Sequence, residues 1–205
     1  MSDLVRGKFH VTSPFWSYLG QPANAVQGNI AVRSNAEVLG VNALTDGAAL
    51  TSGVITAVPV PVEIGDQISK VTVFVGATAA GTPTASFAAL YAGTGAAPAL
   101  ISQTVNGGSA AIPASAAFVF TFASPVLITS TNAPFGFIYV AVSVTATTAP
   151  TLASATVSTA VGYKWFTNGP VALAAVSSGS AVGGVATTTL ATPAAQAATP
   201  IVALS

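Results

Sequence analysis

From Gly53 onward, the chain consists of short runs of β-branched and aromatic residues separated by clusters of Gly, Pro, Asn and Ser. This pattern is typical of short strands joined by turns. Charged helix-forming residues are scarce, and Pro and Gly recur too often for long helices. The pattern predicts an all-β fold with strands at residues 54–62, 68–75, 85–91, 99–105, 117–122, 136–144, 151–158, 171–176, 182–190 and 200–204.

The order of apolar residues in the run at 117–122 indicates which side chains face the core. Phe118, Phe120 and Phe122 alternate with Val119 and Thr121. Because successive side chains of a strand point to opposite faces, the three Phe side chains share one face. We expect that face to be buried.

Two other runs predict where their strands lie in a sheet. Residues 136–144 are apolar on both faces, which is typical of a central strand covered on both sides. Pro59 and Pro61 cannot donate hydrogen bonds to a neighbouring strand, so their strand belongs at an edge or at a crossing between sheets. Short strands at intervals of roughly ten residues predict a two-sheet β-sandwich of the jelly-roll type, with an up-and-down barrel as the alternative.

The chain carries very few charged side chains, 5 acidic and 5 basic, and only Lys164 lies beyond Lys70. An average domain of this length holds about 50. A monomer of this mass exposes about 8,700 Å², so most of its surface must be uncharged. The formal net charge is zero, which favours association. We therefore expect the protein to work inside an assembly; the alternative is an unusually neutral monomer.

The chain contains few residues of the types that act in catalysis. His10 is the only histidine, cysteine is absent, and no G-x-S-x-G motif accompanies the histidine. Glu63 and Asp66 form the one close acidic pair, and we expect a solvent-facing turn there, because a calcium site needs several more oxygen ligands. Phosphate-binding loops are missing, and the cations are too few to bind a nucleic-acid backbone. The sequence predicts a protein that is not an enzyme, with no cofactor, no metal and no nucleic-acid partner.

Residues 1–50 differ from the rest of the chain, since they hold six of the ten charges and show no sustained period. They predict an irregular, extended N-terminal arm, followed by a β-sandwich domain at 51–205. The aromatic and basic residues of the arm are candidate contacts with a partner subunit: Arg6, Lys8, Phe9, Phe15, Trp16 and Tyr18. In the alternative, the arm packs back on its own domain as edge strands and loops.

A second group of candidates lies in a break between predicted strands, where Tyr163, Trp165 and Asn168 occur close together. Exposed Tyr and Trp rings can stack on sugars, so these three residues are candidate glycan contacts. In the alternative, the aromatic cluster plugs one end of the sandwich. No membrane span is predicted, because the least polar stretch, 110–128, is interrupted by Pro and Ser. No signal peptide is predicted either, because the first residues, MSDLVRGKFHVT, contain no continuous apolar run after the basic residues.

Several segments give the chain a resemblance to a known group of proteins. They are ITAVPVPV at 55–62, the Gly65-Asp66-x-Ile68 turn, the run at 71–73, FAALY at 87–91, and the Gly-, Ala- and Thr-rich stretch that ends in IVALS at 201–205. Over roughly residues 53–205, the chain resembles virion structural proteins of tailed phages that infect actinobacteria. The similarity lies in the residue types that form successive strand and loop segments.

This resemblance implies a β-sandwich displayed on the particle as a capsid decoration (minor capsid) protein that stabilises the phage head. The implied partners are the major capsid protein and other copies of the chain, as a homo-oligomer, with no membrane. The implied location is the capsid surface of the virion, after synthesis in the host cytoplasm without a signal peptide. The alternative is a tail-associated or fibre adhesin module that binds host-surface glycans.

Overall fold

The computed structural model describes residues 33–34, 45–94, 97–156, 176–180, 184–190, 194–195 and 198–205. Within these ranges the secondary structure is all β and includes no helix, as predicted. The strands are β1 (Arg33–Ser34), β2 (Thr45–Ala49), β3 (Val54–Pro61), β4 (Gln67–Phe74), β5 (Gly81–Ala92), β6 (Leu100–Gln103), β7 (Ala117–Leu127), β8 (Phe137–Thr148), β9 (Thr151–Thr156), β10 (Val176–Ser180), β11 (Ala194–Ala195), β12 (Ala198–Pro200) and β13 (Val202–Leu204).

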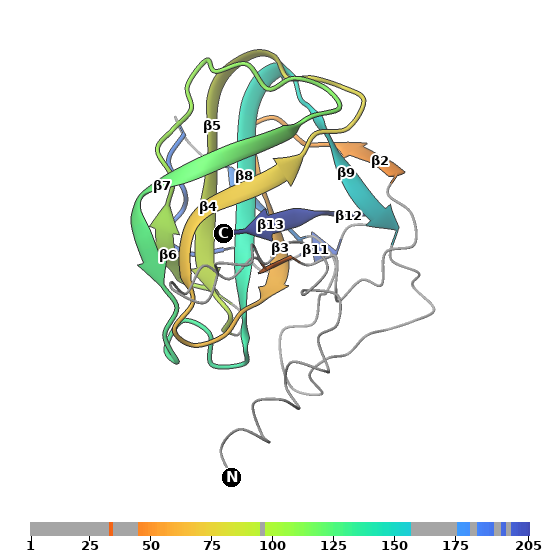
Figure 1. Ribbon diagram of the computed structural model, residues 1–205. Helices are drawn as coiled ribbons and strands as arrows, with labels where there is room; N and C mark the ends of the chain where they lie inside the picture. Colours follow the sequence, from red (N-terminus) through yellow and green to blue (C-terminus); the bar gives the residue numbers. More distant parts are fainter. Residues whose placement is uncertain are drawn as a thin grey trace, which may run out of the picture.

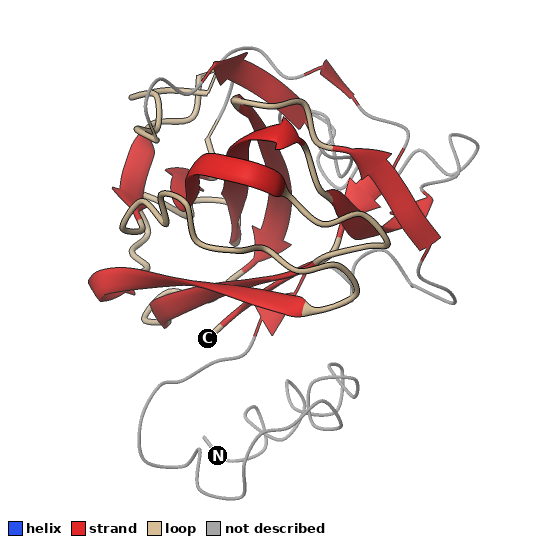
Figure 2. Cartoon of the chain, turned by 90° about the horizontal axis from the view of Figure 1, so that it is seen from above, coloured by secondary structure: helices blue, strands red, loops and turns tan. Residues whose placement is uncertain are grey.

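The strands form three antiparallel sheets (Figure 1). A four-stranded sheet has the order β1-β13-β4-β7, and a six-stranded sheet has the order β11-β10-β3-β8-β5-β6. A three-stranded sheet, β12-β9-β2, completes the set. The four-stranded sheet lies across the six-stranded sheet as a second layer (Figures 1 and 2). The predicted two-sheet β-sandwich is therefore confirmed.

The strand order in the two large sheets is that of a jelly roll. The eight strands β1, β3 to β8 and β13 can be numbered 1 to 8 along the chain. The four-stranded sheet then has the order 1-8-3-6, and the six-stranded sheet, apart from β10 and β11, has the order 2-7-4-5. Most consecutive strands therefore lie in opposite sheets. The up-and-down barrel is wrong, because such a barrel pairs each strand with the next one.

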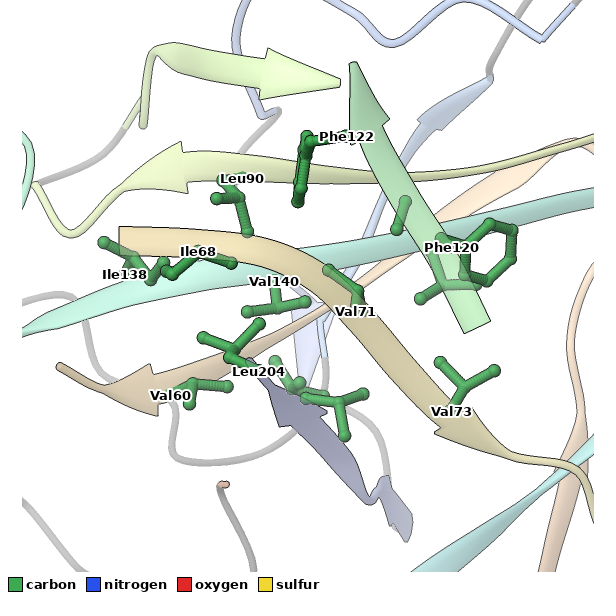
Figure 3. Packing of buried hydrophobic residues seen from close by; sticks show 14 of the residues in the cluster. Val60, Ile68, Val71, Val73, Leu90, Phe120, Phe122, Ile138, Val140 and Leu204 are labelled. Carbon is green, nitrogen blue, oxygen red and sulfur yellow. The ribbon is translucent and has the colours of Figure 1, made fainter. Parts of the chain in front are cut away.

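The main core fills the space between the two large sheets (Figure 3). The six-stranded sheet contributes one face of β3, β5 and β8, and the four-stranded sheet contributes the inner faces of β4, β7 and β13. The side chains labelled in Figure 3 come from both sheets and point toward one another: Val60, Leu90, Ile138, Val140, Ile68, Val71, Val73, Phe120, Phe122 and Leu204.

The prediction of a central strand covered on both sides is confirmed by β8. It lies between β3 and β5, and all its residues from Phe137 to Val144 are buried. Ile138 and Val140 face the main core, whereas Phe137 and Tyr139 belong to a second cluster on the other face of the sheet. Because both faces lie away from water, the run reads as continuously apolar.

The alternation predicted for 117–122 is confirmed in β7. Phe120 and Phe122 are buried and Phe118 is half-buried, while Val119 and Thr121 are exposed. The Phe118 and Phe120 rings meet edge to face, with centroids 4.9 Å apart.

The edge position predicted for Pro59 and Pro61 is found in only half of their strand. β3 pairs with β8 from Thr56 to Pro61, but β10 pairs with β3 only from Val54 to Ala57. Both prolines lie beyond the pairing with β10, so their missing N–H groups cost no hydrogen bond among the described residues. The first half of β3 is an inner strand.

Two predictions of local structure are wrong. The Gly-Thr-Pro sequence at residues 81–83 predicts a turn, but these residues are the beginning of β5. Thr82 has φ 46° there, and the pairing with β8 shifts its register between Pro83 and Ala85. The strand expected at 182–190 is absent from its described part, 184–190, where only isolated bridges occur, among them the one between Thr189 and Ala99.

The side chain of Gln103 explains the missing strand. It donates to the Gly184 carbonyl and accepts from the Ala186 N–H, each at 2.7 Å. Backbone groups that a neighbouring strand would use are thereby occupied, and Gly184 has φ 79°, outside the extended region.

Among the described residues of the segment 1–50, two strands are present. β1 pairs with β13, and β2 pairs with β9. The remainder of the predicted arm lies outside the described residues.

Candidate functional site

The residues proposed from the sequence as contacts lie outside the described residues and stay predictions. They are the arm candidates Arg6, Lys8, Phe9, Phe15, Trp16 and Tyr18 and the glycan candidates Tyr163, Trp165 and Asn168. His10, the one histidine, also lies outside the described residues.

The acidic turn at residues 63–66 is a structural feature of the loop between β3 and β4. Asp66 is 7% exposed, and its Oδ2 accepts a hydrogen bond from the Glu63 N–H at 2.9 Å. The Asp66 N–H donates to the Glu63 carbonyl, which closes the turn. The expected solvent-facing position is correct for Glu63 but wrong for Asp66, because the Asp66 carboxylate holds the backbone of the turn.

Three large apolar side chains lie exposed on the loops and strand end that meet at one end of the sandwich. Ile64 is 67% exposed, Leu127 is 52% exposed and Phe135 is 50% exposed. We call these three residues the end patch. Ile64 belongs to the loop after β3, Leu127 ends β7, and Phe135 precedes β8. In Figure 1, β3, β7 and β8 have these ends at the bottom of the molecule.

Backbone hydrogen bonds hold the end patch together. Gly65 donates to the Ile128 carbonyl and Ile128 donates to the Asp66 carbonyl, both at 2.8 Å. Val62 donates to the Gly136 carbonyl at 3.0 Å. Each residue of the end patch therefore precedes, in the sequence, a residue that makes one of these hydrogen bonds: Ile64 precedes Gly65, Leu127 precedes Ile128, and Phe135 precedes Gly136. The loops need little ordering before they bind a partner.

The electrostatic character of the sandwich changes along the chain. Asp46, Glu63 and Lys70 are exposed charged residues in the first part, whereas residues 71–156 contain no charged side chain. These residues form β5 to β9, including the exposed side of β7. A large part of the described surface thus carries no formal charge.

A short segment covers part of the second face of the six-stranded sheet. Ala186 and Leu190 of this segment, residues 184–190, pack in the second cluster. The Tyr91 hydroxyl donates to the Thr187 carbonyl at 2.9 Å. Burial raises the pKa of the Tyr91 and Tyr139 hydroxyls above the usual value of 10.0, and a second hydrogen bond of Tyr91, with the Thr187 hydroxyl, opposes part of the rise at Tyr91.

The described part of the chain holds no group of three or more His, Cys, Asp or Glu residues placed to bind a metal ion. The hydroxyl oxygens of Ser86 and Ser143 are buried without a hydrogen-bond partner there, and they lie on neighbouring strands, β5 and β8. Nor does any helix in this part have the length and apolar character needed to cross a bilayer.

Comparison with known proteins gives no relative: no family model and no curated protein matches the chain. The candidate site therefore depends on the geometry alone.

The sequence analysis missed the end patch, although a signal was present. Ile64 stands inside a predicted turn, and Phe135 stands between Pro134 and Gly136. Turns lie on the surface, so large apolar residues in turns indicate a contact surface more strongly than the same residues in strands.

Proposed function

We propose that this chain is a non-enzymatic virion structural protein, a capsid decoration (minor capsid) protein that binds and stabilises the phage head. Its partners are the major capsid protein and other copies of itself. It acts by covering shell surface, and the end patch contacts the shell.

The observation that carries the proposal is the absence of charged side chains from residues 71–156, over five consecutive strands of the sandwich. Burying a charged side chain in an interface costs free energy unless it is paired, and the buried centres of interfaces are depleted of charge. A surface without charges avoids this cost. It is suited to permanent contact with a large protein assembly.

The end patch adds an apolar contact at a defined place. Burial of apolar surface contributes about 25 cal/mol per Å². The side chains of Ile64, Leu127 and Phe135 are half or more exposed, so a partner that covers them gains free energy from each.

Labelling of intact particles tests the proposed function. Particles of the phage that encodes this chain would be labelled with gold-conjugated antibody raised against the purified protein, and imaged by electron microscopy. We expect label over the head. Absence of the protein from the particles would overturn the proposal. Label confined to the tail would also overturn it and would favour the alternative of a tail-associated, glycan-binding module. None of the described residues supports that alternative.

The role of the end patch has its own test. Purified wild-type protein and two variants would be sedimented with heads stripped of this protein. Ile64→Asp should weaken binding at least tenfold, whereas Val105→Asp should have little effect. Val105 is a matched control because it is 69% exposed, close to the 67% of Ile64, and lies in the loop after β6. Equal loss in both variants would show that the end patch is not the contact.

A further inference from the structure

β7 is the edge strand of the four-stranded sheet, and part of its backbone faces outward. Val75 donates to the Ala116 carbonyl, and Val73 pairs with Phe118 and Val71 with Phe120. Hydrogen bonding alternates along an antiparallel pair, so the backbone groups of Phe118 and Phe120 face β4. Those of Ala117, Val119 and Thr121 face away from β4, and among the described residues no strand pairs with them.

This half of the β7 edge lacks the features that normally prevent edge pairing. Natural edge strands carry Lys, Pro, a bulge or a cover. The half of β7 near Leu127 has such protection, since it contains Pro125 and a register shift opposite Ile68 and Lys70. Residues 117–121 contain neither charge nor proline, and Ala117, Val119 and Thr121 are all exposed.

We propose that β7 pairs antiparallel with β7 of a second copy of this chain, across a two-fold axis at Val119. Val119 then lies opposite the second copy's Val119, and Ala117 lies opposite its Thr121. The outward backbone groups of the two strands form about six hydrogen bonds. The two four-stranded sheets become one continuous sheet.

The side chains favour a second copy as the occupant. Antiparallel pairing of one strand with itself generates a two-fold axis, so a single surface serves both partners. On the outer face, this register brings only Ala, Val and Thr into contact. On the inner face, the half-buried Phe118 comes beside Phe120 of the other copy, where it loses its remaining exposure.

Charge also permits the pairing. Lys70 is the charged residue of β4, and it lies opposite Thr121. In the paired sheet, the two Lys70 side chains are about 20 Å apart, more than two Debye lengths at physiological salt. With a formal net charge of zero, the two copies have no overall repulsion.

This inference does not rest on attachment to a phage head, because the pairing needs only the isolated protein. A protein that fails to bind heads can still form the dimer, and a monomeric protein can still bind heads. The tests of the two proposals are therefore separate.

Single cysteine variants test the register, since the chain has no cysteine of its own. Residues opposite each other in such a pair have Cα atoms about 5.5 Å apart, within the range of a disulfide. Val119→Cys should form a disulfide-linked dimer under mild oxidation. Thr121→Cys is the matched control on the same edge, because the two copies of residue 121 would be about 14 Å apart. Equal or faster cross-linking of Thr121→Cys would overturn the pairing at Val119.

A charge variant tests the surface without cross-linking. Sedimentation velocity over a range of concentrations should show a reversible dimer for the wild type. Val119→Lys should weaken the dimer at least tenfold, and Val105→Lys should change it less than twofold. Circular dichroism would check that both variants are folded. A wild type that stays monomeric, or a dimer that Val119→Lys leaves intact, would overturn the proposal.

Discussion

The two tyrosines of the six-stranded sheet occupy neighbouring positions with different partners. Tyr91 and Tyr139 pair directly across β5 and β8, and each is at most 1% exposed. The hydroxyl of Tyr91 donates to the Thr187 carbonyl, and the ring of Tyr139 meets the Phe137 ring edge to face at 5.4 Å. Burial disfavours the charged phenolate of both residues.

The raised tyrosine pKa values predict a loss of stability at high pH. In the unfolded chain, tyrosine titrates near pH 10, whereas in the fold the pKa of both groups is higher. The stabilisation from the neutral hydroxyls is complete below about pH 10 and is lost as the pH rises through the folded pKa values. Urea unfolding at about pH 8 and about pH 11 should show a smaller loss for Tyr139→Phe than for wild type. An equal loss in both proteins would contradict this assignment.

At the scale of the element, strands were predictable where the alternation of side chains decided their orientation. β4, β7 and β8 form at the expected places because their inner side chains build the core. The segment at 184–190 could not be predicted, since its conformation depends on Gln103, a side chain far away in sequence. The end patch depends in the same way on hydrogen bonds between distant loops.

Gln103 therefore provides a test of how the covering segment is held. Gln103→Ala removes both hydrogen bonds to residues 184–186 and should lower the local opening free energy by about 1–2 kcal/mol. In hydrogen exchange, the Ala186 amide should exchange about tenfold faster, while the Val140 amide changes less. Gln67→Ala, at an exposed position in β4, is the control. Similar exchange at Ala186 in both variants would show that other contacts hold the segment.

On the scale of the whole molecule, the boundary of the folded unit is set by contacts that the sequence does not reveal. Leu50 is buried in the main core, and the Asp46 side chain accepts a hydrogen bond from the Ala77 N–H at 2.9 Å. Both residues belong to the segment that the sequence analysis assigned to the arm. Short polar strands such as β1 and β2 carry no periodic signal, so only their pairing identifies them.

Two truncations locate this boundary. Removal of residues 1–32 leaves every described strand in place and should change the melting temperature by no more than about 3 °C. Removal of residues 1–50 also deletes β1, β2 and Leu50, and should lower it by about 10 °C. Differential scanning calorimetry measures both. Equal melting temperatures of the two truncated proteins would place the boundary after residue 50.

The position of β13 bears on how the protein is made. β13 lies between β1 and β4, although about 130 residues separate it from β4 along the chain. During translation, β1 and β4 stay apart until residues 202–204 emerge from the ribosome, whereas β3, β5 and β8 can already associate. We expect the nascent chain to leave the β13-side edge of β4 unpaired through most of its synthesis, and chaperones that bind extended apolar segments to engage it there.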